Sequence, residues 1–420
     1  MVLTGSRLFK NKRLLLLAFV VLAVRAMPKL RWLLRLAHYK LTAEVPQLVY
    51  RKTPQNAQLL ERCETLTKLA TVNEQHPHPA IPYERQLLDL PDGGVVSLDW
   101  ALPQWRGGAA RSVQRDVDPL RRTVLVLPGL TGGSGEFYIR TTVDRLLALG
   151  WQVVVLNSRG CANTPLRTPQ LFNCAYTDDL RFVVRHLCAT YRFASREAFV
   201  GLGYSMGSNV LVKYLGEEKD RAGLTAAISV GNPFDLEACS ANFGSFFNRL
   251  TYDKVLNGNL RALFFEKSNA HEIFQDFPGI DLDAVKNSRT VREFDHHMTS
   301  LTFRYPSVDH YYADSSSLKK LPGVRVPLLC VNARDDPISV ALPSRAQVEA
   351  NPNVILCVTK SGGHLGFFED SAHPEERPSL VGEEGSDDRG VRMWSAKVVV
   401  EFAESVLAKE RATKRASVIE

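Results

Sequence analysis

The chain has 420 residues, 45% of them hydrophobic and 23% charged, an ordinary globular composition with ample apolar content for a large core. Its formal net charge is +7, but the basic excess is concentrated near the N-terminus beside an apolar run. Binding to a membrane explains this location better than binding to nucleic acid, so nucleic acid is not expected as a partner. The seven cysteines are scattered without a Cys-x-x-Cys pair, which favours neither a disulfide framework nor a metal site, and no cofactor is expected.

The first 45 residues are predicted to hold the chain at a membrane. Residues 14–24 form an uninterrupted apolar run, about half of the roughly 20 residues that span a bilayer. Over residues 30–41 apolar side chains recur at helical spacing while Arg31 and Arg35 lie on the other face, as in a helix lying in a membrane interface. We expect the apolar run to form a single-pass anchor, for example in the endoplasmic reticulum, followed by this interfacial helix. The alternatives are that the apolar run is a cleaved signal peptide or a segment of a soluble core.

Residues 46–80 are predicted to connect the anchor to the folded core. They contain a helical pattern over 56–69 and a loop rich in proline and histidine at 76–79. A strand over 86–90 then meets the turn Asp92-Gly93-Gly94, and residues 95–100 return as its hairpin partner. The folded core is therefore expected to start near residue 80 and to form one domain over residues 81–412.

From Thr123 the pattern changes to short apolar runs of β-branched residues that alternate with amphipathic helices. This alternation is typical of βαβ units and predicts an α/β fold with a mostly parallel central sheet flanked by helices. The expected strands are residues 123–127, 152–156, 198–202, 226–230, 327–331 and 354–358, and the expected helices are 141–149, 179–191, 206–215 and 394–410.

Two segments interrupt this pattern. Residues 233 to about 320 are rich in Phe, Asn, His and Asp and show helical stretches without clear strands. They are predicted to form a cap inserted into the sheet topology, and such caps usually determine substrate access. The acidic stretch at 369–388 is predicted to be a solvated insert.

A candidate nucleophile lies in Gly203-Tyr204-Ser205-Met206-Gly207, which follows the strand predicted at 198–202 and opens the next helix. A Gly-x-Ser-x-Gly sequence in this setting is typical of a nucleophile elbow, where glycines permit the sharp turn that exposes a strained serine. Ser205 is therefore the expected nucleophile, and a plain helix N-cap is the alternative.

An oxyanion hole needs two backbone donors. The first is the N–H of Met206, the residue after the nucleophile, at a helix N-terminus whose dipole also favours negative charge. The second is assigned to Leu130, in the glycine-rich turn 128–133 that follows the strand at 123–127. A plain turn into a helix is the alternative.

In such hydrolases a carboxylate and then a histidine follow the serine along the chain. His364, just beyond the last predicted strand, is preferred as the base over His373, which falls in the acidic insert. Asp336 is preferred over Asp335 as the orienting carboxylate, because the proline after it holds it in an extended conformation at the strand exit. The expected catalytic residues are thus Ser205, Asp336 and His364.

Several motifs, some of which contain these catalytic residues, occur in order from about residue 45 onward. Through these motifs the chain resembles the AB hydrolase 4 family. That family comprises membrane-anchored α/β-hydrolases, including phospholipid and acylglycerol lipases and yeast medium-chain ester synthases. The resemblance implies the α/β-hydrolase fold, an N-terminal single-pass anchor and the same triad. The motifs are Pro46-Gln47-Leu48, Asp92-Gly93-Gly94 with Ser97-Leu98-Asp99-Trp100, Leu127-Pro128-Gly129-Leu130-Thr131-Gly132, Asn157-Ser158-Arg159-Gly160-Cys161, Gly203-Tyr204-Ser205-Met206-Gly207, Val291-Arg292-Glu293-Phe294-Asp295, Asn332-Ala333-Arg334-Asp335-Asp336-Pro337 and Gly362-Gly363-His364-Leu365-Gly366-Phe367.

That family also carries a proposed acyltransferase pattern, His-x4-Asp, which His271 and Asp276 match in this chain. Residues five apart do not share a helix face. The match is therefore weak support for a second site.

The predicted function is hydrolysis of the carboxylic esters of lipids, acylglycerols or phospholipids, by a serine esterase or lipase that forms an acyl-enzyme. The membrane address and the apolar cap favour lipid esters over small soluble esters. The alternatives are transfer of the acyl group to an alcohol, as in an ester synthase, and a hydrolase-fold protein that only binds.

Overall fold

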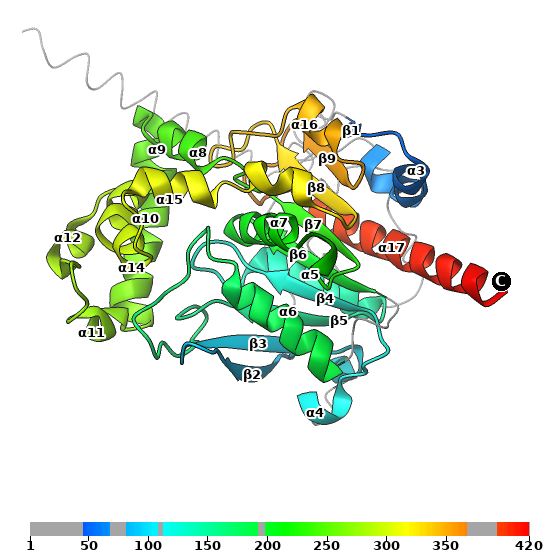
Figure 1. Cartoon of the computed structure of the whole chain (residues 1–420), viewed down its shortest axis with the longest axis horizontal. Helices are drawn as coiled ribbons and strands as arrows, with labels where there is room; N and C mark the ends of the chain where they lie inside the picture. The colour runs from blue at the N-terminus through cyan, green and yellow to red at the C-terminus, as the bar shows by residue number, and fades with distance from the viewer. Residues whose placement is uncertain (1–44, 68–80, 108–111, 192–197, 368–392, 420) are drawn as a thin grey trace, which may run out of the picture.

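The computed structural model describes residues 45–67, 81–107, 112–191, 198–367 and 393–419. These residues form one central sheet with helices on both faces and a helical cap at one end (Figure 1). The predicted anchor and interfacial helix before residue 45 and the predicted acidic insert at 369–388 lie outside the described residues. Within the described part of the chain, no helix is long and apolar enough to cross a membrane.

The sheet has nine strands in the order β1-β9-β8-β7-β6-β4-β5-β3-β2. Neighbours from β9 to β5 are parallel, whereas β1 at one edge and the hairpin of β2 and β3 at the other are antiparallel. The expected α/β class with a mostly parallel sheet is therefore confirmed. The strands are β1 (Gln47–Tyr50), β2 (Glu84–Asp89), β3 (Val95–Ala101), β4 (Thr123–Leu127), β5 (Gln152–Asn157), β6 (Phe199–Tyr204), β7 (Ala226–Val230), β8 (Leu328–Ala333) and β9 (Val354–Thr359).

The parallel strands are buried along their whole length. Every residue of β4 to β9 is buried, because helices cover both faces of a parallel sheet, and this is why each strand is an apolar run in the sequence. The bounds expected for β4 and β7 are those observed, and the bounds expected for β5, β6, β8 and β9 differ by at most two residues.

The prediction that the core starts near residue 80 is wrong. β1 pairs with β9 at the edge of the sheet, and α3 (Pro54–Leu60) and η1 (Glu64–Thr67) follow it. Leu59, Cys63 and Leu66 in this segment are fully buried against α17. β1 has only four residues, and its exposure varies from one to the next, so the segment lacks a long apolar pattern that would mark it as core.

The remaining helices form two layers (Figure 1). One face of the sheet packs against α6, α7 and α16, and the other against α3, α5 and α17. The helix expected at 141–149 begins earlier in the structure. Its first turn follows the glycine-rich segment directly, and no change in the sequence pattern marks where the helix starts. The elements are η2 (Pro103–Gly107), α4 (Val113–Asp116), α5 (Phe137–Ala148), α6 (Asp178–Tyr191), α7 (Met206–Glu218), η4 (Lys219–Arg221), α16 (Arg345–Ala350) and α17 (Trp394–Ile419).

Between β7 and β8 the chain forms helices and loops, as expected for the cap at 233–320. The cap has a small apolar core of its own, which includes Leu260, Phe264, Phe274, Phe294 and Met298. Its elements are α8 (Leu236–Phe243), α9 (Phe246–Leu250), α10 (Tyr252–Ala262), η5 (Leu263–Lys267), α11 (Ala270–Phe274), α12 (Leu282–Asn287), α13 (Val291–Phe294), η6 (Asp295–Thr299), α14 (Ser300–Thr302), α15 (Val308–Ser315) and η7 (Ser317–Gly323).

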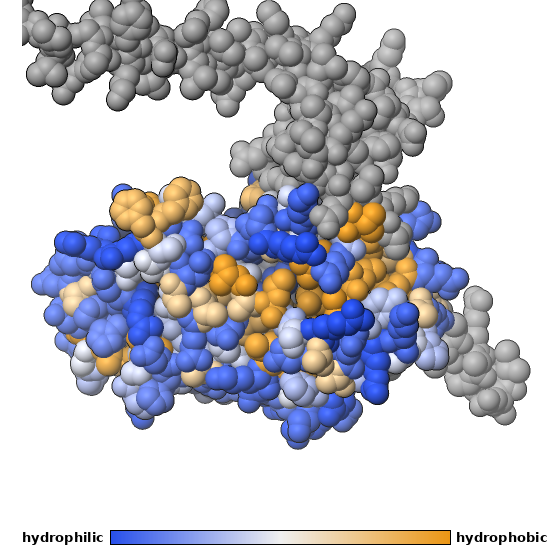
Figure 2. Space-filling view, turned by 90° about the horizontal axis from the view of Figure 1, so that it is seen from above, coloured by the Kyte–Doolittle hydropathy of each residue, from blue (hydrophilic) through white to orange (hydrophobic). Residues whose placement is uncertain are grey.

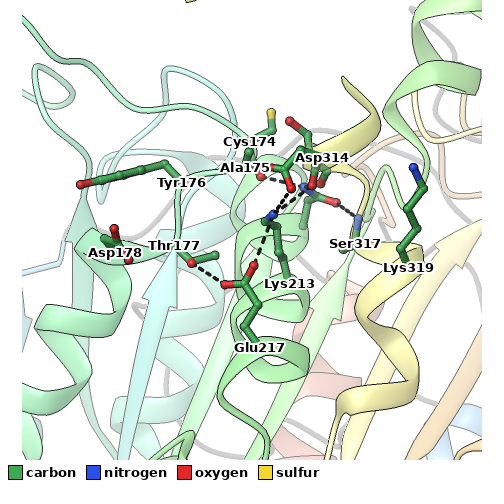
Figure 3. A network of polar contacts seen from close by, with 12 residues as sticks. Cys174, Ala175, Tyr176, Thr177, Asp178, Lys213, Glu217, Asp314, Ser317 and Lys319 are labelled. Carbon is green, nitrogen blue, oxygen red and sulfur yellow. Dashed lines mark hydrogen bonds and ion pairs between the residues drawn. The ribbon is translucent and has the colours of Figure 1, made fainter. Parts of the chain in front are cut away.

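A buried lysine ties α7 to the end of the cap (Figure 3). Lys213 is only 3% exposed, and its Nζ lies 3.0 Å from Asp314 Oδ1 and 3.3 Å from Glu217 Oε1. The hydroxyl of Thr177 donates to the other oxygen of Glu217 at 2.6 Å. A buried ammonium is tolerated only when it is paired in this way.

Asn209, one turn nearer the start of α7, makes a second connection. Its amide donates to the carbonyls of Cys174 (3.0 Å) and Ser315 (2.7 Å) and accepts the N–H of Ser317 (3.1 Å). The helix that begins directly after Ser205 therefore holds both the loop before α6 and the end of the cap.

We expect Lys213→Ala to lower the free energy of unfolding by about 2 kcal/mol, because it removes the ion pair and the backbone hydrogen bond with which the buried ammonium holds Asp314, together with the packing of its buried stem. Urea unfolding of the full chain measures this change. Lys319→Ala is the matched control: Lys319 is 60% exposed, 3.9 Å from Glu237, and its loss should cost less than about 1 kcal/mol. If the two substitutions lower the free energy of unfolding equally, the buried Lys213 contributes no more to stability than an exposed lysine does, and the prediction is wrong.

Candidate active site

Ser205 stands on a sharp turn between β6 and α7. Its backbone has a φ of 51° and a ψ of −117°, a conformation that residues with a side chain rarely adopt. Two glycines make the turn possible: a Cβ at Gly203 would lie 2.5 Å from the backbone of α7, and one at Gly207 would overlap the carbonyl oxygen of Leu127. The N–H of Ser205 donates to the carbonyl of Val230 on β7 at 2.9 Å, so the neighbouring strand holds the strained residue in place.

The structure brings Ser205, His364 and Asp336 together. Ser205 Oγ is 2.6 Å from His364 Nε2, and His364 Nδ1 is 2.9 Å from Asp336 Oδ2. Asp336 follows β8 and His364 follows the adjacent strand β9, so the carboxyl ends of parallel strands place them beside the elbow. In this geometry the imidazole can accept the serine proton through Nε2 while Nδ1–H donates to the carboxylate.

The two adjacent aspartates have different partners. Asp336 is buried, and its Oδ1 also accepts the N–H groups of Ile338 (2.8 Å) and Ser339 (2.9 Å), which fix the carboxylate at the strand exit. Asp335 is exposed, and its Oδ1 accepts the N–H of Gly363 at 2.9 Å. Asp336 thus contacts the imidazole, and Asp335 holds the loop that carries it.

The turn after β4 lies directly against Ser205. A Cβ added at Gly129 would be 3.3 Å from the Cβ of Ser205, and the N–H of Gly129 donates to the hydroxyl of Tyr138 at 3.1 Å. Leu130 and Met206 line the same pocket as Ser205, and their backbone N–H groups make no hydrogen bond within the described residues. Two unpartnered donors beside a nucleophile are suited to bind a developing oxyanion.

Polar side chains behind this turn keep it in place. Asp99 on β3 accepts hydrogen bonds from Ser134 Oγ (2.5 Å) and Asn157 Nδ2 (2.8 Å), and Asn157 Oδ1 accepts the N–H of Ser134 (2.9 Å). Sequence reasoning assigned no role to these residues or to Tyr138, because they meet only through strands and helices distant in the chain. The available signals were the occurrence of Asp99 and Asn157 in two of the motifs and the presence of these polar residues in largely apolar strands.

A mostly apolar pocket extends from Ser205 and His364 into the cap. It contains about 990 Å³ of space not filled by atoms, including its opening to solvent. A pocket with this lining suits an apolar group. The cap side chains that line it include Leu236, Phe243, Leu256, Leu260, Phe294 and Met298.

One carboxyl group lies in the wall of this pocket. Asp295 accepts hydrogen bonds from Thr299 Oγ1 (2.7 Å) and from the hydroxyl of Tyr312 (2.9 Å). Burial raises the pKa of Asp295 to about 6, because the charged form loses its hydration. Asp295 ends the motif at residues 291–295, to which sequence reasoning assigned no chemistry.

The residues that match the acyltransferase pattern do not line this pocket. The ring of His271 on α11 packs against Phe265 with 5.5 Å between ring centroids, and Asp276 is exposed. His373 lies outside the described residues. In the described part of the chain, no cluster of His, Cys, Asp and Glu is arranged to hold a metal ion.

Comparison with known proteins places this geometry in context. A sequence model of the alpha/beta hydrolase fold family matches residues 122–371. The chain is 36% identical over 344 residues to embryogenesis-associated protein EMB8 of Picea glauca, covering 80% of this chain and 69% of that protein. It is 32% identical over 324 residues to monoacylglycerol lipase of Saccharomyces cerevisiae (69% and 70% covered) and 37% identical over 295 residues to phospholipase ABHD3 of Mus musculus (69% and 68% covered).

We expect Asp295→Asn to change how stability depends on pH. The pKa of Asp295 in the folded state, about 6, lies above the ordinary aspartate value, so the folded chain binds this proton more tightly than the unfolded chain. The free energy of unfolding of the wild type should therefore fall by about 2 kcal/mol relative to the variant between pH 4 and pH 7. Urea unfolding at each pH measures the difference. Asp283→Asn, which replaces an exposed carboxylate of the cap, should leave the profile unchanged, and a pH-independent difference for Asp295→Asn would contradict the prediction.

Proposed function

This chain belongs to the alpha/beta hydrolase fold family, and from that premise we propose that it cleaves carboxylic esters of lipids with Ser205 as its nucleophile. Relatives named as a monoacylglycerol lipase and a phospholipase support ester hydrolysis as the reaction class. The observation that carries the assignment to Ser205 is the hydrogen bond of 2.6 Å between its Oγ and His364 Nε2, at the end of an apolar pocket.

In the proposed first step, His364 takes the proton of Ser205 while Oγ attacks the acyl carbonyl carbon. The oxygen of the tetrahedral intermediate receives hydrogen bonds from the N–H groups of Leu130 and Met206. Asp336 keeps Nδ1 of the imidazole protonated and stabilises the imidazolium. As the intermediate collapses, His364 gives the proton to the leaving alcohol, and the acyl group stays on Ser205.

In the second step, water replaces the alcohol. His364 takes a proton from the water as its oxygen attacks the acyl carbon, and the collapse of the second intermediate returns that proton to Ser205 Oγ. The fatty acid is released and the free serine is restored. Each step uses the same two donors and the same base, so one arrangement serves both.

The apolar pocket supports a lipid ester as the substrate. An acyl chain placed there is removed from water at a gain of about 0.8 kcal/mol for each buried CH₂ group. Leu256, Leu260 and Met298 line the pocket beyond Ser205, so the reacting carbonyl would lie at the serine and the chain would extend into the cap.

We expect Ser205→Ala to abolish covalent labelling of the full chain by a fluorophosphonate probe, because the probe reacts only with an activated serine oxygen. Ser208→Ala is the matched control. Ser208 is buried one turn further along α7 and donates to the carbonyl of Val230 at 2.8 Å. Its loss removes one of the two hydrogen bonds at Val230 but leaves the contact between Ser205 and His364, so labelling should persist. Labelling that persists in Ser205→Ala would refute the assigned nucleophile.

Asparagine substitutions should distinguish the two aspartates. Asp336→Asn should lower kcat for a soluble ester by about 10³–10⁴-fold, since it removes the charge that orients the imidazole and stabilises its protonated form. Asp335→Asn should lower kcat by less than about 10-fold, because only a backbone hydrogen bond of the loop is affected. The reverse order of effects would assign the role to Asp335.

A further inference from the structure

Large apolar side chains stand exposed on one side of the cap. Phe246, Phe247, Leu250 and Val255, on α9 and α10, are 84%, 66%, 57% and 61% exposed. In Figure 2, pale orange side chains stand out from the edge of the molecule at the end where Figure 1 places α9. Single exposed apolar residues are common on protein surfaces, but four within ten residues of sequence mark an interaction site.

A basic hollow lies beside these residues. Its lining contains no acidic side chain, and none of its cations forms an ion pair within the described residues. The Nε of Arg261 is buried there without a hydrogen-bond partner. Two carboxylates lie close by without forming ion pairs with these cations: Asp253 accepts the N–H of Val291 and interacts electrostatically with Arg249, and Glu293 accepts the backbone N–H of Arg289. The cations are Arg249, Lys254, Arg261, Lys286 and Arg289.

The apolar residues and the hollow form one surface, which we call the docking face. Leu250 lines the hollow together with Arg249 and Lys254, so two cations lie among the exposed apolar side chains of α9 and the start of α10. Apolar groups that can enter the acyl region, flanked by cations that can meet phosphate, are typical of segments that bind anionic lipid surfaces.

The docking face also lies close to the pocket that contains Ser205. α10 presents Lys254 and Val255 outward, whereas Leu256 and Leu260 on the same helix line the pocket. α8, which precedes the docking face in the chain, contributes Phe243 to the pocket wall. A single layer of helix therefore separates a lipid at the docking face from the pocket.

We propose that the docking face binds a lipid surface that carries anionic phospholipids. Phe246, Phe247, Leu250 and Val255 enter the acyl region, and the cations of the hollow bind lipid phosphates. The complementarity of charge selects an anionic surface over a second copy of this chain, because two such faces would repel each other. Binding of this kind does not require catalysis by Ser205.

Insertion is tested with a tryptophan placed on the docking face. In the full chain carrying Ser205→Ala, Phe247→Trp is mixed with vesicles of phosphatidylcholine and phosphatidylserine that contain brominated acyl chains. We expect the emission of the added tryptophan, taken as the difference from the parent chain, to fall by about twofold or more. Leu120→Trp is the control, because Leu120 is 61% exposed but lies before the amino end of β4, whereas the cap lies at the carboxyl ends of the parallel strands.

Equal quenching at positions 247 and 120, or none at 247, would overturn the proposal. Because the serine is absent, the result does not depend on whether Ser205 is the nucleophile. A second result would also overturn the proposal. If the tryptophan at 247 is not quenched, and the chain self-associates in a way that depends on protein concentration and that Phe246→Ser with Phe247→Ser abolishes, the docking face binds a second copy of the chain.

The basic hollow is tested by reversing charge. Lys254→Glu with Lys286→Glu should remove most of the quenching at 247 in vesicles that contain phosphatidylserine. Arg185→Glu with Arg345→Glu makes the same change in net charge at side chains 67% and 77% exposed outside the cap, and should leave quenching in place. Equal loss in the two double variants would show that net charge alone drives binding and would overturn the role of the hollow.

Discussion

The structure depends on the contact between two backbone turns, the elbow that carries Ser205 and the turn that follows β4. A side chain at Gly207 would overlap the end of β4, and one at Gly129 would press against Ser205. The two turns can meet because β4 and β6 are neighbours with Leu127 opposite Gly203. This approach places Leu130 and Met206 in the lining of the same pocket as Ser205, so the proposed oxyanion hole depends on strand order and on two missing side chains.

The strained backbone of Ser205 costs about 1–3 kcal/mol and persists only because its surroundings fix it. The carbonyl of Val230 accepts both the N–H of Ser205 and the hydroxyl of Ser208, so one acceptor on β7 holds the elbow from two sides. Further along, Lys213 and Asn209 bind α7 to the cap. The same helix therefore stabilises the nucleophile and the wall of the pocket, and a change in one affects the other.

The sequence predicts the features that rest on local patterns. Strands buried on both faces are uninterrupted apolar runs, and the proposed catalytic residues follow such strands, so both could be located without coordinates. Pro337 and the family resemblance favoured Asp336 over Asp335. Long-range contacts gave no comparable signal: β1 is four residues long, Tyr138 reaches Gly129 from another element, and the burial of Asp295 depends on how α13 and α15 pack. The anchor before residue 45 stays a prediction.

The cap differs from an ordinary surface layer, because apolar side chains of α9 and the start of α10 stand exposed on its outer side while α10 lines the pocket on its inner side. A helix at the surface of a globular protein usually has one apolar face, yet Leu256 and Leu260 point into the pocket while Val255 points outward. An acyl chain that crosses water on its way to the serine loses about 0.8 kcal/mol for each exposed CH₂ group. If the outer side of the cap lies in lipid, the chain passes from one apolar environment to another across about one helix diameter, roughly 10 Å. The exposed apolar side chains of the cap and its apolar pocket wall then share one physical cause, the low solubility of the proposed substrate.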